Sequence, residues 1–287
     1  MTDLPLLIAP QRLNDALGDP AVRVLDATVL LQLHPDGSEV TIESGRALFD
    51  DGHIPGAGFA DLIELSDPVR PAWFMLPEPN RFAAGMSRLG VGPGTHVVVY
   101  DGADGIWAAR LWWMLRAFGF DAVSVLDGGI KAWRAAGLPL STETRDVTPG
   151  EFEARYRPEL VATREEVEAV VRDGGACLVN ALPAELFRGD VPITPGRFGH
   201  IPGSISVPHG DLVDPDSNRF LPADQLRERF AAADVLDRPR VITYCGGAID
   251  AAFDAFALAL LGRDDVAVYD GSLVEWSSDP DLPLDVA

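Results

Sequence analysis

The sequence predicts an α/β protein of two tandem domains, each a mostly parallel sheet flanked by helices. Short β-branched segments such as residues 96–101 alternate with apolar segments of helical spacing such as residues 107–118. This alternation is typical of parallel strands joined by crossover helices. The length of 287 residues exceeds what one hydrophobic core usually holds, and a series of motifs occurs twice. Both observations predict two copies of one domain.

The first copy contains three segments rich in strand-forming residues, and a loop or turn follows each of them. Strands are predicted at residues 23–27, 96–101 and 123–127. Helices are predicted at residues 80–88, 107–118 and 130–136, with a shorter one between residues 45 and 52.

The second copy repeats the motifs of the first in the same order. The peptide Gly-His-Ile-Pro-Gly occupies residues 52–56 and again residues 199–203. A segment that begins Asp-Gly and ends in Trp occupies residues 127–133 and 270–276. The two members of these pairs are 147 and 143 residues apart, a constancy that indicates an internal duplication.

The two copies differ in a chemically important way at one position. Asp101 in the first corresponds to Cys245 in the second, and each follows a tyrosine at the end of a predicted strand. From the duplication we predict a first domain at residues 1–140, a linker rich in Pro, Thr and charge at residues 141–160, and a second domain at residues 161–287.

The composition argues against several classes of function. Asp and Glu number 44 against 23 Lys and Arg, which gives a formal net charge of −21 and a pI near 4.4. Such a surface repels nucleic acid and anionic membranes, so neither is a predicted partner. We expect no signal peptide and no membrane span, because the apolar stretches are too short. Two cysteines without metal-ligand spacing suit a reducing cytoplasm, and no metal and no cofactor is predicted.

Residues 241–253 (VITYCGGAIDAAF) carry the strongest local signal for chemistry. A short strand leads to Cys245, two glycines follow, and an apolar helix is expected to begin after Asp250. A thiol in this position faces unpaired N–H groups and the positive end of a helix dipole, which favours the thiolate. The glycines allow the backbone to curl around whatever the sulfur carries. The alternative is a buried cysteine in a plain tight turn.

With these motifs, the chain resembles the tandem-domain rhodanese family, the thiosulfate and 3-mercaptopyruvate sulfurtransferases. The resemblance covers nearly the whole chain and rests on the paired Gly-His-Ile-Pro-Gly motifs, on residues 270–276 and on residues 99–113. It implies that the first domain is catalytically silent and that Cys245 is the nucleophile. It also implies that Cys245 takes sulfane sulfur as a persulfide, cradled by loop N–H groups, and passes it to a thiol or cyanide acceptor.

The loop departs from both types known in that family. Mercaptopyruvate-type loops read Cys-Gly-Ser-Gly-Val-Thr and thiosulfate-type loops read Cys-Arg-Lys-Gly-Val-Thr. Here Gly247 replaces the serine that helps protons move in the first type, and no basic pair for thiosulfate is present. The family's substrate-binding arginine appears as Leu186, with Arg188 nearby as a substitute. The predicted substrate-binding set is therefore Arg188 with the loop residues Gly246, Gly247, Ala248, Ile249 and Asp250.

Asp250 has two interpretations. Its negative charge near the sulfur would by itself raise the pKa of the thiol. It can also be read as a cap for the helix that follows, which we prefer to a catalytic role. A phosphatase of the Cys-x5-Arg type is disfavoured because the sixth residue after Cys245 is Ala251.

The remaining candidates have structural interpretations that we prefer. His53 and His200 lie in Gly-x-x-Pro-Gly turns, where backbone contacts of the ring are a better explanation than a Cys/His dyad. Cys177 lies in an apolar strand, which indicates a core residue. Three tryptophans of one apolar helix are expected to pack in the core or at a domain interface: Trp107, Trp112 and Trp113. Three aspartates of a Pro-interrupted loop are read as solvated and not as a metal site: Asp211, Asp214 and Asp216.

The predicted function is a cytoplasmic sulfurtransferase that uses a small-molecule sulfur donor and a thiol or cyanide acceptor, with a protein acceptor also allowed. A 3-mercaptopyruvate-like donor is favoured over thiosulfate because the loop supplies no cation for a doubly charged donor. The alternative is a catalytically degenerate rhodanese-fold protein that binds a thiol compound or a partner protein. Formation of a sulfur adduct on Cys245 separates the two.

Overall fold

The two halves of the chain form two sheets with the same strand order. The computed structural model describes residues 4–33, 40–68, 74–144, 146–194 and 197–287. The first sheet is parallel throughout, and its strands in spatial order are β1 (Leu7–Ile8), β7 (Val123–Leu126), β6 (His96–Tyr100), β2 (Val22–Asp26) and β5 (Gly58–Phe59). The second is also parallel, in the order β8 (Val161–Ala162), β14 (Ala267–Tyr269), β13 (Val241–Tyr244), β9 (Cys177–Asn180) and β12 (Ile205–Ser206). Identical order in both halves confirms the duplication of one α/β fold.

Helices connect and cover the two sheets. Those of the first half are α1 (Pro10–Ala16), α2 (Arg46–Asp51), α3 (Leu62–Leu65), α4 (Pro79–Arg88), α5 (Ile106–Ala117) and α6 (Gly129–Ala135). Those of the second half are α7 (Arg164–Asp173), α8 (Ala184–Arg188), α9 (Ala223–Ala232), α10 (Ile249–Leu260) and α11 (Ser272–Ser278), with two 3₁₀ turns, η1 (Pro158–Leu160) and η2 (His209–Leu212). Two small antiparallel pairs complete the structure: β3 (Val29–Leu33) with β4 (Val40–Ser44), and β10 (Pro192–Thr194) with β11 (Arg197–Phe198).

The predicted helices of the first copy are present, with ends shifted by one residue. The helix expected after Asp250 differs, because it begins at Ile249. Its N-cap is Ala248, which adopts a left-handed conformation with φ of 63°. Asp250 therefore lies inside the first turn, and its interpretation as the helix cap is wrong.

The part of the chain that the structure describes contains no helix long and apolar enough to cross a membrane. Residues 1–3, which belong to the stretch where no signal peptide is expected, lie outside the described residues. The exact limits of the two domains and of the linker stay a prediction.

Side chains of the first sheet alternate between two cores. Val98 and Tyr100 face the core that α1, α2 and α6 cover. Val97 and Val99 face the opposite core, to which α4 and α5 contribute and which continues without a break into the second domain. The shared core explains how two sheets can be held in one arrangement, because apolar surface from both domains is buried together.

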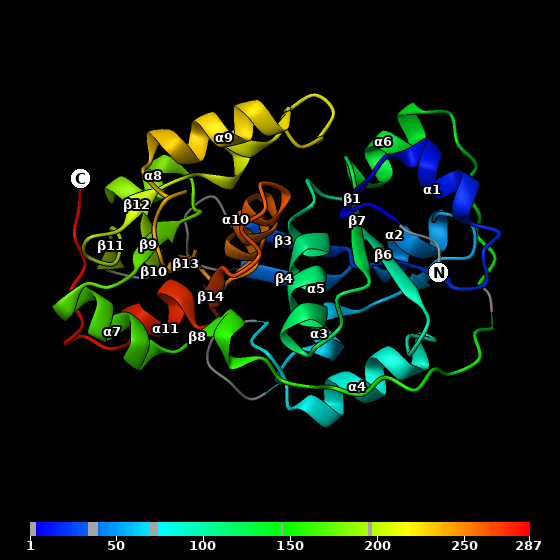
Figure 1. Cartoon of the computed structure of the whole chain (residues 1–287), viewed down its shortest axis with the longest axis horizontal. Helices are drawn as coiled ribbons and strands as arrows, with labels where there is room; N and C mark the ends of the chain where they lie inside the picture. Colours follow the sequence, from blue (N-terminus) through cyan, green and yellow to red (C-terminus); the bar gives the residue numbers. More distant parts are fainter. Residues whose placement is uncertain (1–3, 34–39, 69–73, 145, 195–196) are drawn as a thin grey trace.

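Helices α5 and α10 lie against each other between the two sheets (Figure 1). Each follows the loop that begins at Asp101 or Cys245, just after β6 or β13, so their packing brings both loops to the domain interface. Trp112 of α5 meets Phe256 of α10 edge-on, with ring centroids 4.9 Å apart. All three tryptophans are buried, which confirms the prediction that they pack in the core or at a domain interface.

Replacing Trp112 with Ala should lower the free energy of unfolding by about 3–5 kcal/mol, because a buried aromatic side chain leaves a cavity. The Trp112 side chain is only 2% exposed. Trp112→Phe is the matched control, since the indole N–H has no hydrogen-bond partner among the described residues. Denaturant unfolding followed by circular dichroism should show a loss for Phe of less than half that for Ala. Equal losses would mean that the size of the cavity does not determine the loss.

Candidate active site around Cys245

Cys245 lies just after β13, in the turn that leads into α10. It is 2% exposed. Its backbone N–H donates to the hydroxyl of Ser272 (3.1 Å), and that hydroxyl donates to the carbonyl of Tyr269 (2.8 Å). The N–H of Leu273 donates to the carbonyl of Cys245 (3.0 Å). The start of α11, in the repeated Asp-Gly-Ser motif, thus fixes the backbone of the cysteine.

Three backbone N–H groups lie close enough to the Cys245 sulfur to act on its charge. They belong to Ala251, Gly247 and Asp250, and each lowers the pKa of the thiol. The left-handed conformation of Ala248 turns the chain between them, so N–H groups from the loop and from the first turn of α10 converge on one point. Converging N–H groups stabilise an anion at that point.

The pKa of the Cys245 thiol is nevertheless raised to about 12. Burial is the main cause, because an anion is costly in a site without water, and the Asp250 carboxylate adds to it. The three N–H groups lower the pKa without outweighing these two effects. The expectation that this setting favours the thiolate is therefore wrong for the free protein, since desolvation is stronger than the helix N-terminus.

The loop of the first domain has the same construction with a different anion. The fully buried carboxylate of Asp101 accepts hydrogen bonds from the N–H groups of Ala103 (2.9 Å), Gly105 (3.1 Å) and Ala108 (2.9 Å). Burial raises the pKa of Asp101 to about 6, with the backbone hydrogen bonds acting in the opposite direction. The first domain therefore has a cradle of N–H groups that its own side chain already fills.

A cation of the first domain reaches the Cys245 loop. Arg110 of α5 is fully buried and donates to the Asp270 carboxylate (2.7 Å), to the Ala248 carbonyl (3.4 Å) and to the carbonyl of Phe74. The second oxygen of Asp270 accepts from the N–H of Leu76 (2.7 Å). The ion pair thus ties the left-handed residue of the loop to the neighbouring domain.

The loop also has an acidic side, of which the sequence revealed only Asp250. The Asp250 carboxylate lies 3.8 Å from Nδ1 of His209, whose Nε2 lies 3.3 Å from the carboxylate of Asp104 in the first domain. Sequence reasoning missed Arg110, Asp104 and His209 as neighbours of the site. Arg110 and Asp104 both lie within residues 99–113, on which the family resemblance rests, whereas no motif marks His209.

The structure brings together five of the six predicted substrate-binding residues: Gly246, Gly247, Ala248, Ile249 and Asp250 form one loop with Cys245. Arg188 ends α8, where its guanidinium is about half exposed and donates to Asp190 at 2.7 Å. Its part in substrate binding stays a prediction.

The two histidines of the repeated turns have structural roles. His53 is buried and stacks on Phe49 with ring centroids 3.8 Å apart, and its Nδ1 lies 2.8 Å from the Phe49 carbonyl. His200 repeats this arrangement on Phe187, with centroids 3.7 Å apart. Cys177 is 6% exposed within β9, and burial raises the pKa of its thiol. The structural interpretations of these three residues are confirmed.

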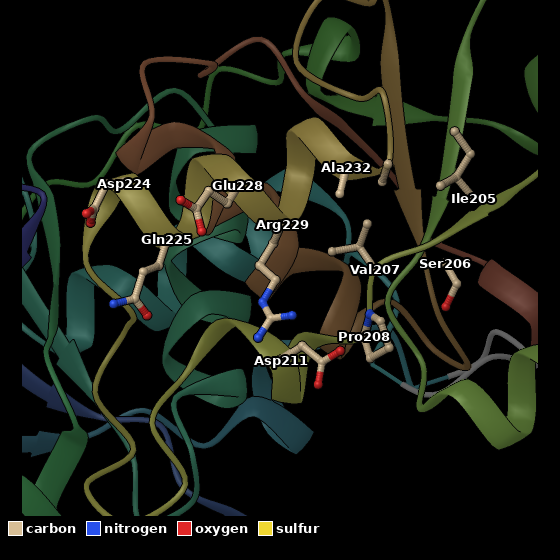
Figure 2. Close-up of a pocket in the computed structure, with 11 residues that line it drawn as sticks. Ile205, Ser206, Val207, Pro208, Asp211, Asp224, Gln225, Glu228, Arg229 and Ala232 are labelled. Carbon is tan, nitrogen blue, oxygen red and sulfur yellow. The ribbon is translucent and has the colours of Figure 1, made fainter.

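A separate surface pocket lies between α9 and the segment that leads into η2 (Figure 2). It has a volume of about 850 Å³ and is lined by residues of 205–211 and of α9. Figure 2 shows Arg229 pointing toward Asp211 across it. No residue of the Cys245 loop lines this pocket, so it is not the site of the thiol. Within the described ranges no three His, Cys, Asp or Glu side chains are arranged to hold a metal ion.

Comparison with known proteins identifies the family. Residues 9–136 and 163–279 each match the family model of the rhodanese-like domain. The chain belongs to the rhodanese-like family. The two matched segments correspond to the two sheets, and the Cys245 loop lies in the second of them.

Relatives of known activity are similar over most of the chain. The human 3-mercaptopyruvate sulfurtransferase is 40% identical over 239 residues, which are 80% of this chain and 79% of the human one. The enzyme of the same name from Escherichia coli strain K12 is 37% identical over 276 residues, 95% of both chains. The crystal structure of Escherichia coli SseA, a 3-mercaptopyruvate sulfotransferase of rhodanese fold, matches with a TM-score of 0.82 and 34% identity over 93% of this chain and 98% of that one. The predicted family, fold and sulfurtransferase activity are confirmed.

Replacing Asp250 with Thr should lower the pKa of Cys245, because it removes the charge that adds to the effect of burial. We expect alkylation by iodoacetamide to be roughly three- to tenfold faster at pH 8. Asp250 caps nothing, so the loss of stability should stay below about 1 kcal/mol, the usual value of an acidic group in a first helical turn.

Asp250→Asn is the matched control, since it removes the charge and little volume, and should react as fast as the Thr variant. Peptide mapping assigns the label to Cys245 or Cys177, and a melting curve checks folding. A folded variant with unchanged or slower alkylation would mean that the carboxylate does not act on the sulfur.

Proposed function

We propose that this protein transfers sulfane sulfur from a small donor to a thiol or cyanide acceptor through a persulfide on Cys245. The observation that carries the proposal is the pair of equivalent loops. Asp101 shows that this loop holds a buried anion on three N–H groups, and Cys245 has the same number of N–H groups directed at its sulfur. The loop of the second domain therefore offers an anion site at a nucleophilic atom.

The transfer proceeds in two displacements. The Cys245 thiolate attacks the sulfur of the donor, a sulfur–sulfur bond forms, and the carbon–sulfur bond of a mercaptopyruvate-like donor breaks. Its electron pair leaves with the carbon, which takes up the proton that the donor thiol gives up. An acceptor thiolate then attacks the outer sulfur and releases Cys245 as a thiolate. In both steps the loop N–H groups hold the sulfur that carries the charge.

The donor is 3-mercaptopyruvate or a close analogue. Names of the human and Escherichia coli relatives support this choice. The two arginines discussed for the site already form ion pairs with carboxylates: Arg110 with Asp270, and Arg188 with Asp190. A doubly charged donor such as thiosulfate needs cationic partners, and these two are engaged.

A cytoplasmic location and a protein acceptor belong to the same proposal. Both cysteines are free, which suits a reducing compartment. One relative, a thiosulfate/3-mercaptopyruvate sulfurtransferase of Arabidopsis thaliana that is 35% identical over 297 residues (95% of this chain, 76% of the relative), is mitochondrial. The cellular location of the protein and the identity of its acceptor therefore need tests of their own, separate from the test of sulfur transfer through Cys245.

A second candidate function is binding without turnover. It is favoured by the raised pKa of the Cys245 thiol and by the replacement of the family's serine and arginine with Gly247 and Leu186. A protein of this kind would hold a thiol compound at the loop and form no sulfur adduct.

Incubation with 3-mercaptopyruvate should add one sulfur atom, about 32 Da, to the intact protein as a cysteine persulfide. Cys245→Ser should abolish the adduct, and Cys177→Ser, the matched control, should keep it. Electrospray mass spectrometry followed by peptide mapping is the measurement. No adduct with any donor of a panel, in a folded protein, would favour the binding function, and an adduct on Cys177 would reject Cys245 as the carrier.

Thiosulfate should be a poor donor, with kcat/KM at least roughly tenfold below that for 3-mercaptopyruvate, because charge-assisted hydrogen bonds to its oxygens are missing. Thiocyanate formation from cyanide measures both donors in one assay. Since salt screens the overall negative charge of the protein, the assay is repeated at high ionic strength. Comparable values for the two donors under both conditions would contradict the proposed donor.

A further inference from the structure

His209 lies where the two domains meet, beside the acidic part of the Cys245 loop. Its Nε2 lies 3.3 Å from a carboxylate oxygen of Asp104, in the loop that precedes α5 of the first domain. Its Nδ1 lies 3.3 Å from the carbonyl of Ala181 and 3.8 Å from the carboxylate of Asp250. The ring of Phe253 packs edge-on against it, with centroids 5.9 Å apart. The side chain is thus held on several sides and is only 15% exposed.

The surroundings of the ring favour its charged form at neutral pH. Both ring nitrogens face carbonyl or carboxylate oxygens, which accept hydrogen bonds and do not donate them when the carboxylates are ionised. A neutral imidazole has one N–H and would place a lone pair against one of these oxygens, whereas the imidazolium donates from both nitrogens. Burial lowers the pKa of His209. The carboxylates of Asp104, Asp250 and Asp254 raise it by more than burial lowers it, so the pKa is about 9.

The positive charge of His209 lies beside the Asp250 carboxylate, which in turn acts on the Cys245 thiol. The Asp250 carboxylate raises the pKa of Cys245. Burial raises the pKa of Asp250 itself, and the positive charge of His209 acts in the opposite direction and lowers it. Asp254, one turn further along α10, is fully buried, and neither of its oxygens has a hydrogen-bond partner in the described part of the chain. Burial raises its pKa well above the usual value, which favours its neutral form.

We propose that His209 is a positioning residue for sulfur transfer: anchored by Asp104 of the first domain, its positive charge compensates Asp250 and so allows Cys245 to ionise beside that carboxylate. The proposal depends on the proposed role of Cys245, and it is independent of the identity of the donor. It also gives the silent domain a part in the reaction, because that domain supplies the anchor.

The titratable groups that face the ring are Asp104 from the first domain and Asp250 and Asp254 from α10. Asp211 shares η2 with His209, but it is exposed and lies toward Arg229 (Figure 2). Asp211→Asn is therefore a matched control, which removes a charge from the same segment without touching the ring.

The test is the rate of alkylation of Cys245 by iodoacetamide between pH 7.5 and 10.5 in four proteins: the wild type, His209→Gln, Asp250→Asn and the double variant. At pH 8 His209→Gln should react roughly three- to tenfold more slowly, because the thiolate loses a nearby cation while Asp250 keeps its charge. The difference should vanish above about pH 10, since the wild-type ring loses its proton near pH 9. The double variant should return to within roughly twofold of the wild type, because both charges are then absent.

A merely structural role would give a different pattern. His209→Gln would then slow alkylation at every pH, and Asp250→Asn would not rescue it; either this result or an unchanged rate in His209→Gln overturns the proposal. Asp211→Asn should stay within roughly twofold of the wild type. If His209→Gln does not fold, Asp104→Asn provides the second test, since a weaker anchor should lower the pH at which the wild-type advantage is lost. A normal alkylation series without any sulfur adduct would reject the proposed function and leave the charge compensation standing.

Discussion

The ion pair between Arg110 and Asp270 is the interaction on which the arrangement of the site depends. It joins α5 of one domain to the segment before α11 of the other, at 2.7 Å, with both side chains out of water. Buried charges are tolerated only when their hydrogen bonds are met, and removing one partner of such a pair typically costs about 3–5 kcal/mol. Here the carbonyls of Ala248 and Phe74 and the N–H of Leu76 meet most of the remaining hydrogen-bonding groups, whereas Nε of Arg110 has no partner among the described residues. The contact with Ala248 also fixes the turn that directs N–H groups at Cys245.

The duplication explains how one fold can hold either a silent or a reactive loop. In both domains a strand ends, the chain turns, and a long apolar helix begins with its N–H groups directed back at the last side chain. Asp101 brings a permanent acceptor to that point and satisfies the N–H groups. Cys245 brings a neutral thiol instead, so in the transfer that we propose the same N–H groups are left for an anion that forms only during the reaction. The difference between the two domains rests on this one side chain.

Much of the fold could be predicted from the sequence because it is encoded locally. Strand segments, apolar helices and the repeated Gly-His-Ile-Pro-Gly turns are each read from neighbouring residues, and their repetition gave the two-domain architecture. The loop residues 245–250 could be found in the same way. His209, Asp104 and Arg110 could not be placed at the site, because each reaches it only through the packing of α5 on α10 and of η2 on α10. The error about the ionisation of Cys245 has the same origin, since a strand–turn–helix motif predicts N–H groups but not how completely the site excludes water.

A raised thiol pKa is compatible with a persulfide carrier when the sizes of the anions are considered. An increase from 9.0 to about 12 corresponds to roughly 4 kcal/mol against the free thiolate. Most of this comes from desolvation, whose cost falls as the charge is spread over a larger volume. A persulfide distributes its charge over two sulfur atoms and extends it further into the converging N–H groups, so the site disfavours the small thiolate more than the larger persulfide anion. Stabilisation that increases along the reaction is what accelerates it. In the transfer that we propose, the buried, acidic loop therefore keeps Cys245 protonated until a donor arrives, and the charges around Asp250 set how much free energy its ionisation costs.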